Sequence, residues 1–110
     1  MTWPTAFLWT CVLETPIYFL LLRRPLRSGL TAAVAGICLQ WLTHPALWWL
    51  FPEEWSYWTA FFVCETAVVA VEGAATALLL RLFGERNAFV RGFAIALLAN
   101  AFSASLGLLF

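Results

Sequence analysis

The sequence predicts an all-α integral membrane protein in which four transmembrane helices form an up-down antiparallel bundle with short loops. The first reason is composition. Of the 110 residues, 64% are hydrophobic and only 11% are charged, which is more apolar surface than a soluble domain of this size can bury. The second reason is that the chain contains seven tryptophans and six arginines but no lysine or aspartate, and long stretches carry no charge. These features indicate that lipid, not water, surrounds most of the chain.

Four apolar segments match the length of a membrane span. They comprise residues 3–22, 29–51, 58–80 and 88–110. Each has about 20 to 23 residues, enough to cross ~30 Å of hydrocarbon at ~1.5 Å per residue. The connections between them are short, so neighbouring helices are expected to run antiparallel. The alternation of apolar and polar residues that marks a transmembrane strand is missing from the sequence. We therefore expect one domain covering residues 1–110.

The arginines predict the orientation of the bundle. They lie in the first connection or in and beside the third, at Arg23, Arg24, Arg27, Arg81, Arg86 and Arg91. The charged residues of the second connection are both glutamates, Glu53 and Glu54. By the positive-inside rule, loops 23–28 and 81–87 are cytoplasmic and both termini lie outside. All seven tryptophans then fall in the outer half of the protein, as expected for an interfacial aromatic belt.

Polar residues within the predicted spans are the candidates for function. They are Glu14, Gln40, His44, Glu65, Glu72, Asn100 and Ser103. An ionised side chain near the bilayer centre costs about 2.5 to 3.5 kcal/mol on insertion scales. The four ionisable residues among them therefore need a partner, neutralisation or a function.

Counting along the helices places these groups at two depths. His44 and Glu65 both lie about 6 Å outward of the midplane, a shared level that would allow them to bond to each other. Glu14 and Glu72 lie roughly 3 to 5 Å inward of the midplane. Small and polar residues also share helical faces, which favours a common polar interior.

This pattern favours a small channel or carrier for a cation, either a proton or a divalent metal ion. Carboxylates and an imidazole can pass protons between them. The candidate metal ligands are Glu14, His44, Glu65 and Glu72, and together with amide oxygens they suit zinc, manganese or iron better than copper(I). The sequence leaves the cofactor unknown, and a divalent metal ion is its one candidate.

Two other classes of protein stay open. An integral membrane enzyme could use a Glu and His site, with or without a metal ion, although the sequence has no H-E-x-x-H motif and no nucleophile elbow. An accessory subunit of a larger membrane complex would need only a structural polar network. Because four helices are few for a complete transport route, we expect a homo-oligomer or a membrane complex. Nucleic-acid binding is excluded, because membrane topology already accounts for the arginines.

Overall fold

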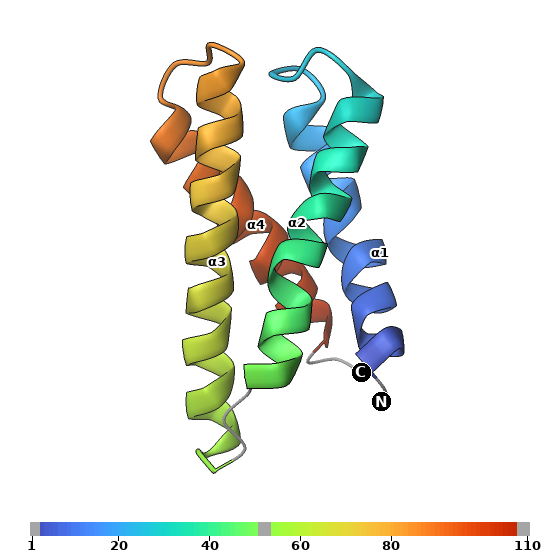
Figure 1. Cartoon of the computed structure of the whole chain (residues 1–110), viewed down its shortest axis with the longest axis vertical. Helices are drawn as coiled ribbons and strands as arrows, with labels where there is room; N and C mark the ends of the chain where they lie inside the picture. Colours follow the sequence, from blue (N-terminus) through green and yellow to red (C-terminus); the bar gives the residue numbers. More distant parts are fainter. Residues whose placement is uncertain (1–2, 51–53, 108–110) are drawn as a thin grey trace.

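The computed structural model describes residues 3–50 and 54–107, and all of the regular secondary structure in these ranges is helical. The helices are α1 (Trp3–Leu22), α2 (Gly29–Leu50), α3 (Tyr57–Leu82) and α4 (Ala88–Gly107) (Figure 1). The prediction of an all-helical chain with four helices is confirmed. Residue 51 and residues 108–110, which the sequence assigned to spans, lie outside the described residues.

Three of the helices are long and apolar enough to cross a membrane. The corresponding segments are Gly29–Leu47, Tyr57–Leu82 and Ala88–Leu106, while α1 contributes a shorter apolar segment, Phe7–Leu22. The molecule is 43 Å long, compared with about 30 Å for the hydrocarbon core of a bilayer. Large apolar side chains such as Trp49, which is 84% exposed, cover its sides. Such a surface is a liability in water but is suited to lipid.

The described tryptophan side chains lie on this apolar surface. Those whose side chains are described are at least half exposed, namely Trp9, Trp41, Trp49, Trp55 and Trp58. The side chains of Trp3 and Trp48 lie outside the described residues. Exposure on the outside of the bundle is what an aromatic belt requires.

The helices pair as two hairpins. In Figure 1, the α1–α2 and α3–α4 connections lie at one end of the molecule, and the start of α1 and the end of α4 lie toward the other. α3 packs most extensively against α4, and α1 against α2. Contacts between the two hairpins are made mainly by α4, which packs across α1. The contact between α2 and α3 is the smallest of any packed pair of helices. The bundle is consequently open between α2 and α3.

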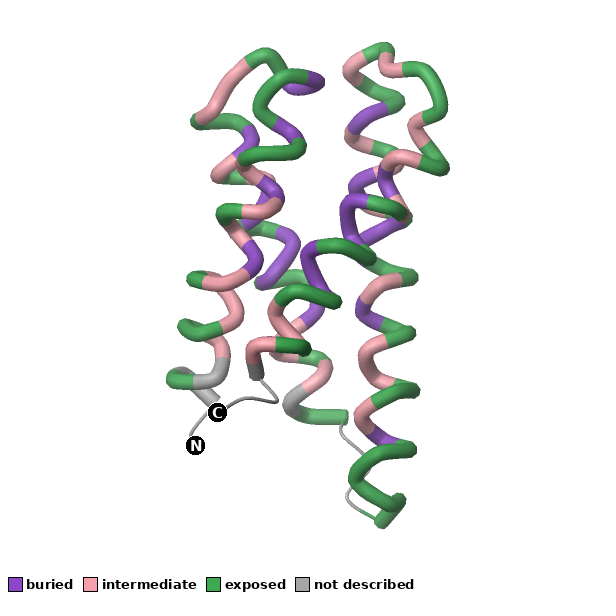
Figure 2. The backbone as a smooth tube through the Cα atoms, turned by 180° about the vertical axis from the view of Figure 1, so that it is seen from behind, coloured by how far each residue is buried: buried purple, intermediate pink, exposed green. Residues whose placement is uncertain are grey.

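Packing is tighter at the end that carries the two hairpin connections. Leu22, Leu26 and Leu80 are buried there in one apolar cluster, which extends to Tyr18, one turn before the end of α1. Figure 2 shows buried segments in the middle of the bundle and toward this end, and mostly exposed or half-buried segments toward the other. The polar residues near the middle therefore lie at the boundary between a closed half and an open half.

The end of α3 depends on a glycine. Gly84 has a φ angle of +78° and donates a backbone hydrogen bond to the Arg81 carbonyl, while Glu85 donates to the Leu80 carbonyl. This is a Schellman ending, in which the residue after the helix adopts the left-handed conformation.

Replacing Gly84 by alanine is expected to lower the free energy of unfolding by about 1 kcal/mol, because a Cβ is unfavourable at positive φ. No atom within 4 Å would meet that Cβ, so backbone strain is the only cost. Unfolding in detergent micelles measures the effect. Gly84→Asn is the control, because asparagine tolerates this conformation better. Equal losses for both variants would contradict the assignment of the cost to φ.

Candidate functional site

Glu72 of α3 is the centre of a buried hydrogen-bond network. Its side chain is 0% exposed and accepts a hydrogen bond from each of the other three helices. The Tyr18 hydroxyl of α1 lies 2.6 Å from Oε1, the Thr43 hydroxyl of α2 lies 2.8 Å from Oε2, and Nδ2 of Asn100 in α4 lies 3.3 Å from Oε1. One carboxylate thus ties the four helices together.

Two of these three donors, Thr43 and Asn100, also have a backbone carbonyl within hydrogen-bonding distance. Thr43 has one hydroxyl proton and two acceptors in range, and the Glu72 oxygen is closer than its alternative, the Leu39 carbonyl at 3.2 Å. Asn100 has two amide protons and also donates to the Ala96 carbonyl at 2.8 Å. Because both of its acceptors are oxygens, the Asn100 amide nitrogen is assigned without ambiguity. Its carbonyl oxygen therefore points away from Glu72.

A second carboxylate, Glu14 of α1, is buried beside this network. It is 1% exposed, and the Ser103 hydroxyl donates to its Oε1 at 2.5 Å. The two carboxyl groups are close enough to interact electrostatically. Ser103 lies three residues after Asn100 and also hydrogen-bonds to the Asn100 carbonyl at 3.2 Å. One face of α4 therefore contacts both Glu14 and Glu72.

Among the described residues, several buried polar atoms have no hydrogen-bond partner. They are Glu14 Oε2, Thr15 Oγ1, Thr76 Oγ1 and both polar atoms of the Gln40 side chain. The Gln40 amide lies near the Glu14 carboxyl, but the two groups do not meet in hydrogen-bonding geometry. Unsatisfied buried groups are uncommon and costly in native proteins. The described interior therefore has hydrogen-bonding capacity that its own side chains do not use.

Two of the residues selected from the sequence lie elsewhere. His44 is half-buried on the side of α2 that faces α1, where its ring lies 6.0 Å from the Phe7 ring centroid. Glu65 lies between α3 and α4. Among the described residues neither forms a hydrogen bond or an ion pair with the other. The suggested His44–Glu65 contact is therefore wrong, because a shared depth does not place two side chains on facing sides of their helices.

The four proposed metal ligands are consequently split. Glu14 and Glu72 belong to the buried network, and His44 lies at the α1–α2 contact. Glu65 lines the groove between α3 and α4, close enough to Glu72 to interact with it electrostatically but without a shared hydrogen bond. Across the described ranges, 3–50 and 54–107, no group of three His, Cys, Asp or Glu side chains could hold a metal ion. The residues do not fit a divalent metal site within one copy of the chain.

Two members of the network, together with the buried Thr76, were not among the residues selected from the sequence. Tyr18 follows Glu14 by four residues and Thr43 follows Gln40 by three, so each lies on the same helical face as a residue that was selected. Thr76, fully buried, follows Glu72 by four residues in the same way. Helical spacing from the selected residues could have identified all three.

Two grooves flank α3 and reach the network from opposite sides. The groove between α2 and α3 has a volume of about 260 Å³ and includes Thr43 among its lining residues. The groove between α3 and α4 has a volume of about 270 Å³ and includes Glu65 and Asn100. Thr43 and Asn100 both donate to Glu72. Thr43 therefore lies between the Glu72 carboxylate and one groove, and Asn100 lies between it and the other.

Comparisons with protein-family models, curated proteins and solved structures found no match for this chain. Its class is therefore defined by its own features. It is a small helical protein with three helices able to span a membrane and two buried carboxylates in one polar network. That network is the candidate functional site.

Proposed function

We propose that this protein is a multi-pass membrane protein that conducts protons through the interior of its bundle, with Glu72 and Glu14 as the proton-binding groups. The orientation that we propose places loops 23–28 and 81–87 in the cytoplasm and both termini outside. Lipid covers the apolar sides. Proton conduction is the form of cation transport that the arrangement of side chains supports best.

The observation that carries this proposal is the burial of two carboxyl groups, Glu72 and Glu14, in one network without a cation. Both are at most 1% exposed and they interact electrostatically. Every arginine of the chain lies in a connection or within four residues of one, away from this depth. Two negative charges in such a site repel each other, and a shared proton removes one of them. Binding and release of that proton is an elementary step of transport.

Access to the network is asymmetric, which suits a transporter. Toward the arginine-rich end, the buried side chains of Leu22, Leu26 and Leu80 close the bundle. Toward the other end, the two grooves beside α3 leave Glu72 behind Thr43 on one side and Asn100 on the other. In the orientation that we propose, the network is accessible from the outer half of the protein and closed from the inner half. Transport would also need a second state, in which the network is accessible from the inner half.

A proton is a better candidate than a divalent metal ion. Metal sites need three or more suitable ligands held together, and the described residues bring no such group together within one copy. A proton needs only neighbouring groups that can accept and donate it, and Glu14, Ser103, Glu72 and Tyr18 are such groups. A homo-oligomer remains part of the proposal, because four short helices leave little room for a complete route.

The test is proton uptake into liposomes that contain the purified protein, driven by a potassium diffusion potential and followed with an internal pH-sensitive dye. We expect the wild type to conduct protons. In the Glu72→Gln variant the proton flux should fall by a factor of about ten or more, because glutamine cannot release a proton. Glu54→Gln is the matched control, since Glu54 is exposed, and it should keep the wild-type flux. His44→Ala should also conduct, because His44 lies outside the network.

Two outcomes would overturn the proposal. One is a folded wild-type protein that conducts no protons. The other is a Glu72→Gln variant that conducts as well as the wild type. Either result would shift the assignment to a structural network.

The second candidate function is an accessory subunit of a larger membrane complex, favoured by the groove between α2 and α3. Apart from Thr43, its lining is entirely apolar or sulfur-containing: Leu42, Ala46, Leu47, Leu50, Cys64, Ala67, Val68 and Val71. An apolar groove of this kind can receive a helix of another subunit. Absence of flux together with co-purification of a defined membrane partner would favour this assignment.

A further inference from the structure

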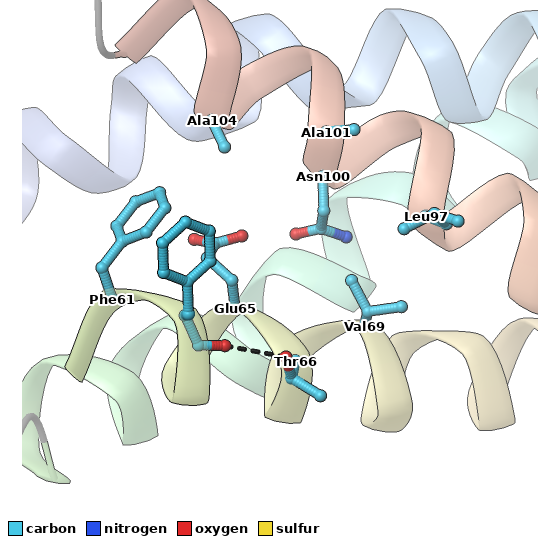
Figure 3. Close-up of a pocket in the computed structure, with 9 residues that line it drawn as sticks. Phe61, Glu65, Thr66, Val69, Leu97, Asn100, Ala101 and Ala104 are labelled. Atoms are coloured by element: carbon cyan, nitrogen blue, oxygen red, sulfur yellow. Dashed lines mark hydrogen bonds between the residues drawn. The ribbon is translucent and has the colours of Figure 1, made fainter. Parts of the chain in front are cut away.

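The groove between α3 and α4 contains a carboxylate that the proposed proton network does not use. Glu65 extends from α3 into this groove, opposite Asn100 of α4 (Figure 3). In the part of the chain that the structure describes, the Glu65 carboxylate has neither a hydrogen bond nor an ion pair. A half-buried carboxylate without a partner among the described residues, in a mostly apolar groove, favours a positively charged occupant.

Asn100 adds a second acceptor on the opposite wall. Its amide nitrogen is used by Glu72 and by the Ala96 carbonyl, which leaves the amide oxygen for the groove. In Figure 3 this oxygen and the Glu65 carboxylate face each other across the space between the two helices. Thr66, the third polar residue of the lining, donates its hydroxyl to the Phe62 carbonyl at 2.7 Å. The Glu65 carboxylate and the Asn100 amide oxygen are both acceptors, and neither can satisfy the other without an added proton or cation.

Aromatic rings form the end of the groove beside Glu65. Phe61 and Phe62 line it, and their ring centroids lie 5.4 Å apart in an edge-to-face arrangement. Trp58, one turn earlier, lies 5.8 Å from Phe61 and 6.1 Å from Phe62. The faces of aromatic rings attract cations, most strongly organic ammonium groups that are only weakly hydrated.

The remaining wall is aliphatic. Val69, Leu97, Ala101 and Ala104 complete the groove, whose volume is about 270 Å³. This is close to the lower limit of about 300 Å³ for typical small-molecule pockets. The occupant is therefore small, apolar over most of its surface, and charged at one point.

We propose that this groove is a binding site for a small amphiphilic organic ammonium ion, with its charge between Glu65 and the Asn100 amide oxygen and its apolar part against Phe61 and Phe62. An inorganic divalent ion fits less well, because one carboxylate and one amide oxygen leave most of its coordination sites empty. A neutral lipid chain fits less well, because it leaves the carboxylate without compensation. The site goes beyond the proposed proton route, and its occupancy can be measured whether or not the protein conducts protons.

The experiment compares two probes of the same shape, benzyltrimethylammonium and its neutral carbon analogue neopentylbenzene, by methyl NMR of the full-length protein in micelles. Benzyltrimethylammonium has a permanent charge, so its own titration does not complicate the result. We expect it to shift the Val69, Leu97 and Ala101 methyl signals in a saturable manner. In Glu65→Gln, which keeps the size of the side chain, the affinity should fall by at least about tenfold, as expected for loss of a partly desolvated ion pair. Neopentylbenzene should give the same response in both proteins.

The control variant is Glu54→Gln, which should bind benzyltrimethylammonium like the wild type because Glu54 lies on the exposed segment before α3. Unchanged signals from Leu22 and Leu80 in the buried core would show that each variant is folded. Equal affinity of wild type and Glu65→Gln would overturn the proposal. So would the absence of saturable shifts in the groove, or shifts confined to methyl groups on the opposite surface, such as those of Leu20 and Leu98.

Discussion

Replacing Glu72 by alanine is expected to lower the free energy of unfolding by about 2 to 4 kcal/mol. Hydrogen bonds between transmembrane helices average ~0.6 kcal/mol each and reach ~1.7 kcal/mol, and the Glu72 carboxylate accepts three of them. Loss of the side chain also leaves a cavity at a fully buried position. Tyr18 should lose most, because Thr43 and Asn100 keep backbone acceptors at Leu39 and Ala96.

Reversible unfolding in mixed micelles, followed by circular dichroism, measures this loss. The control is Thr66→Ala, because the Thr66 side chain is exposed and its hydroxyl donates to the Phe62 carbonyl of its own helix, its one hydrogen bond within the described ranges. The control should remain within about 0.5 kcal/mol of the wild type. Glu72→Gln, which keeps the shape and two of the acceptor contacts, should lose less than about 1.5 kcal/mol. A Glu72→Ala protein as stable as the wild type, or more stable, would show that the network does not stabilise the fold.

Replacing Gly92 by alanine is expected to cost about 1 to 3 kcal/mol, even though alanine is the better helix former. Gly92 of α4 lies against the backbone of α3, and a Cβ there would be 2.5 Å from the Ala77 Cα and would also overlap the Ala77 backbone nitrogen. A backbone cannot rotate away as a side chain can. α3 and α4 would have to separate, and they form the most extensive helix contact of the bundle.

The same unfolding assay applies, with Gly73→Ala as the comparison. A Cβ at Gly73 would meet the Phe93 ring, its Cε1 at 2.8 Å, and a ring can move where a backbone cannot. We expect a smaller loss for Gly73→Ala than for Gly92→Ala. The reverse order would mean that the α3–α4 distance is not set at Gly92.

Much of the helical architecture could be predicted because it depends on local chemistry. The spans were predicted from runs of apolar residues between arginine-rich or glutamate-rich connections. α1 and α4 begin at the predicted residues, and each described end of α2 and α3 lies within two residues of its predicted position. The burial of Glu14, Gln40, Glu72 and Asn100 also follows from the cost of polar groups in lipid. No tertiary information is needed for either result.

The pairing of these residues could not be predicted in the same way. Counting along a helix gives the depth of a side chain, but the direction in which it points depends on how each helix is rotated and tilted against its neighbours. His44 and Glu65 were assigned the same depth, yet His44 packs beside Phe7 and Glu65 lies between α3 and α4. Small residues such as Gly92 set how closely two helices approach, and that contact positions Asn100 relative to Glu72.

The amino-acid sequence by itself thus determined a chain of four apolar helices with rare polar residues inside, because hydrophobicity and helix length are properties of each segment alone. Only the tertiary structure decided that Glu72 is the shared acceptor for Tyr18, Thr43 and Asn100. It also decided that Glu65 lies in its own groove without a hydrogen-bond partner among the residues that the structure describes. The physical reason is that hydrogen bonds between helices depend on side-chain direction over a few ångströms, and packing of all four helices together sets that direction.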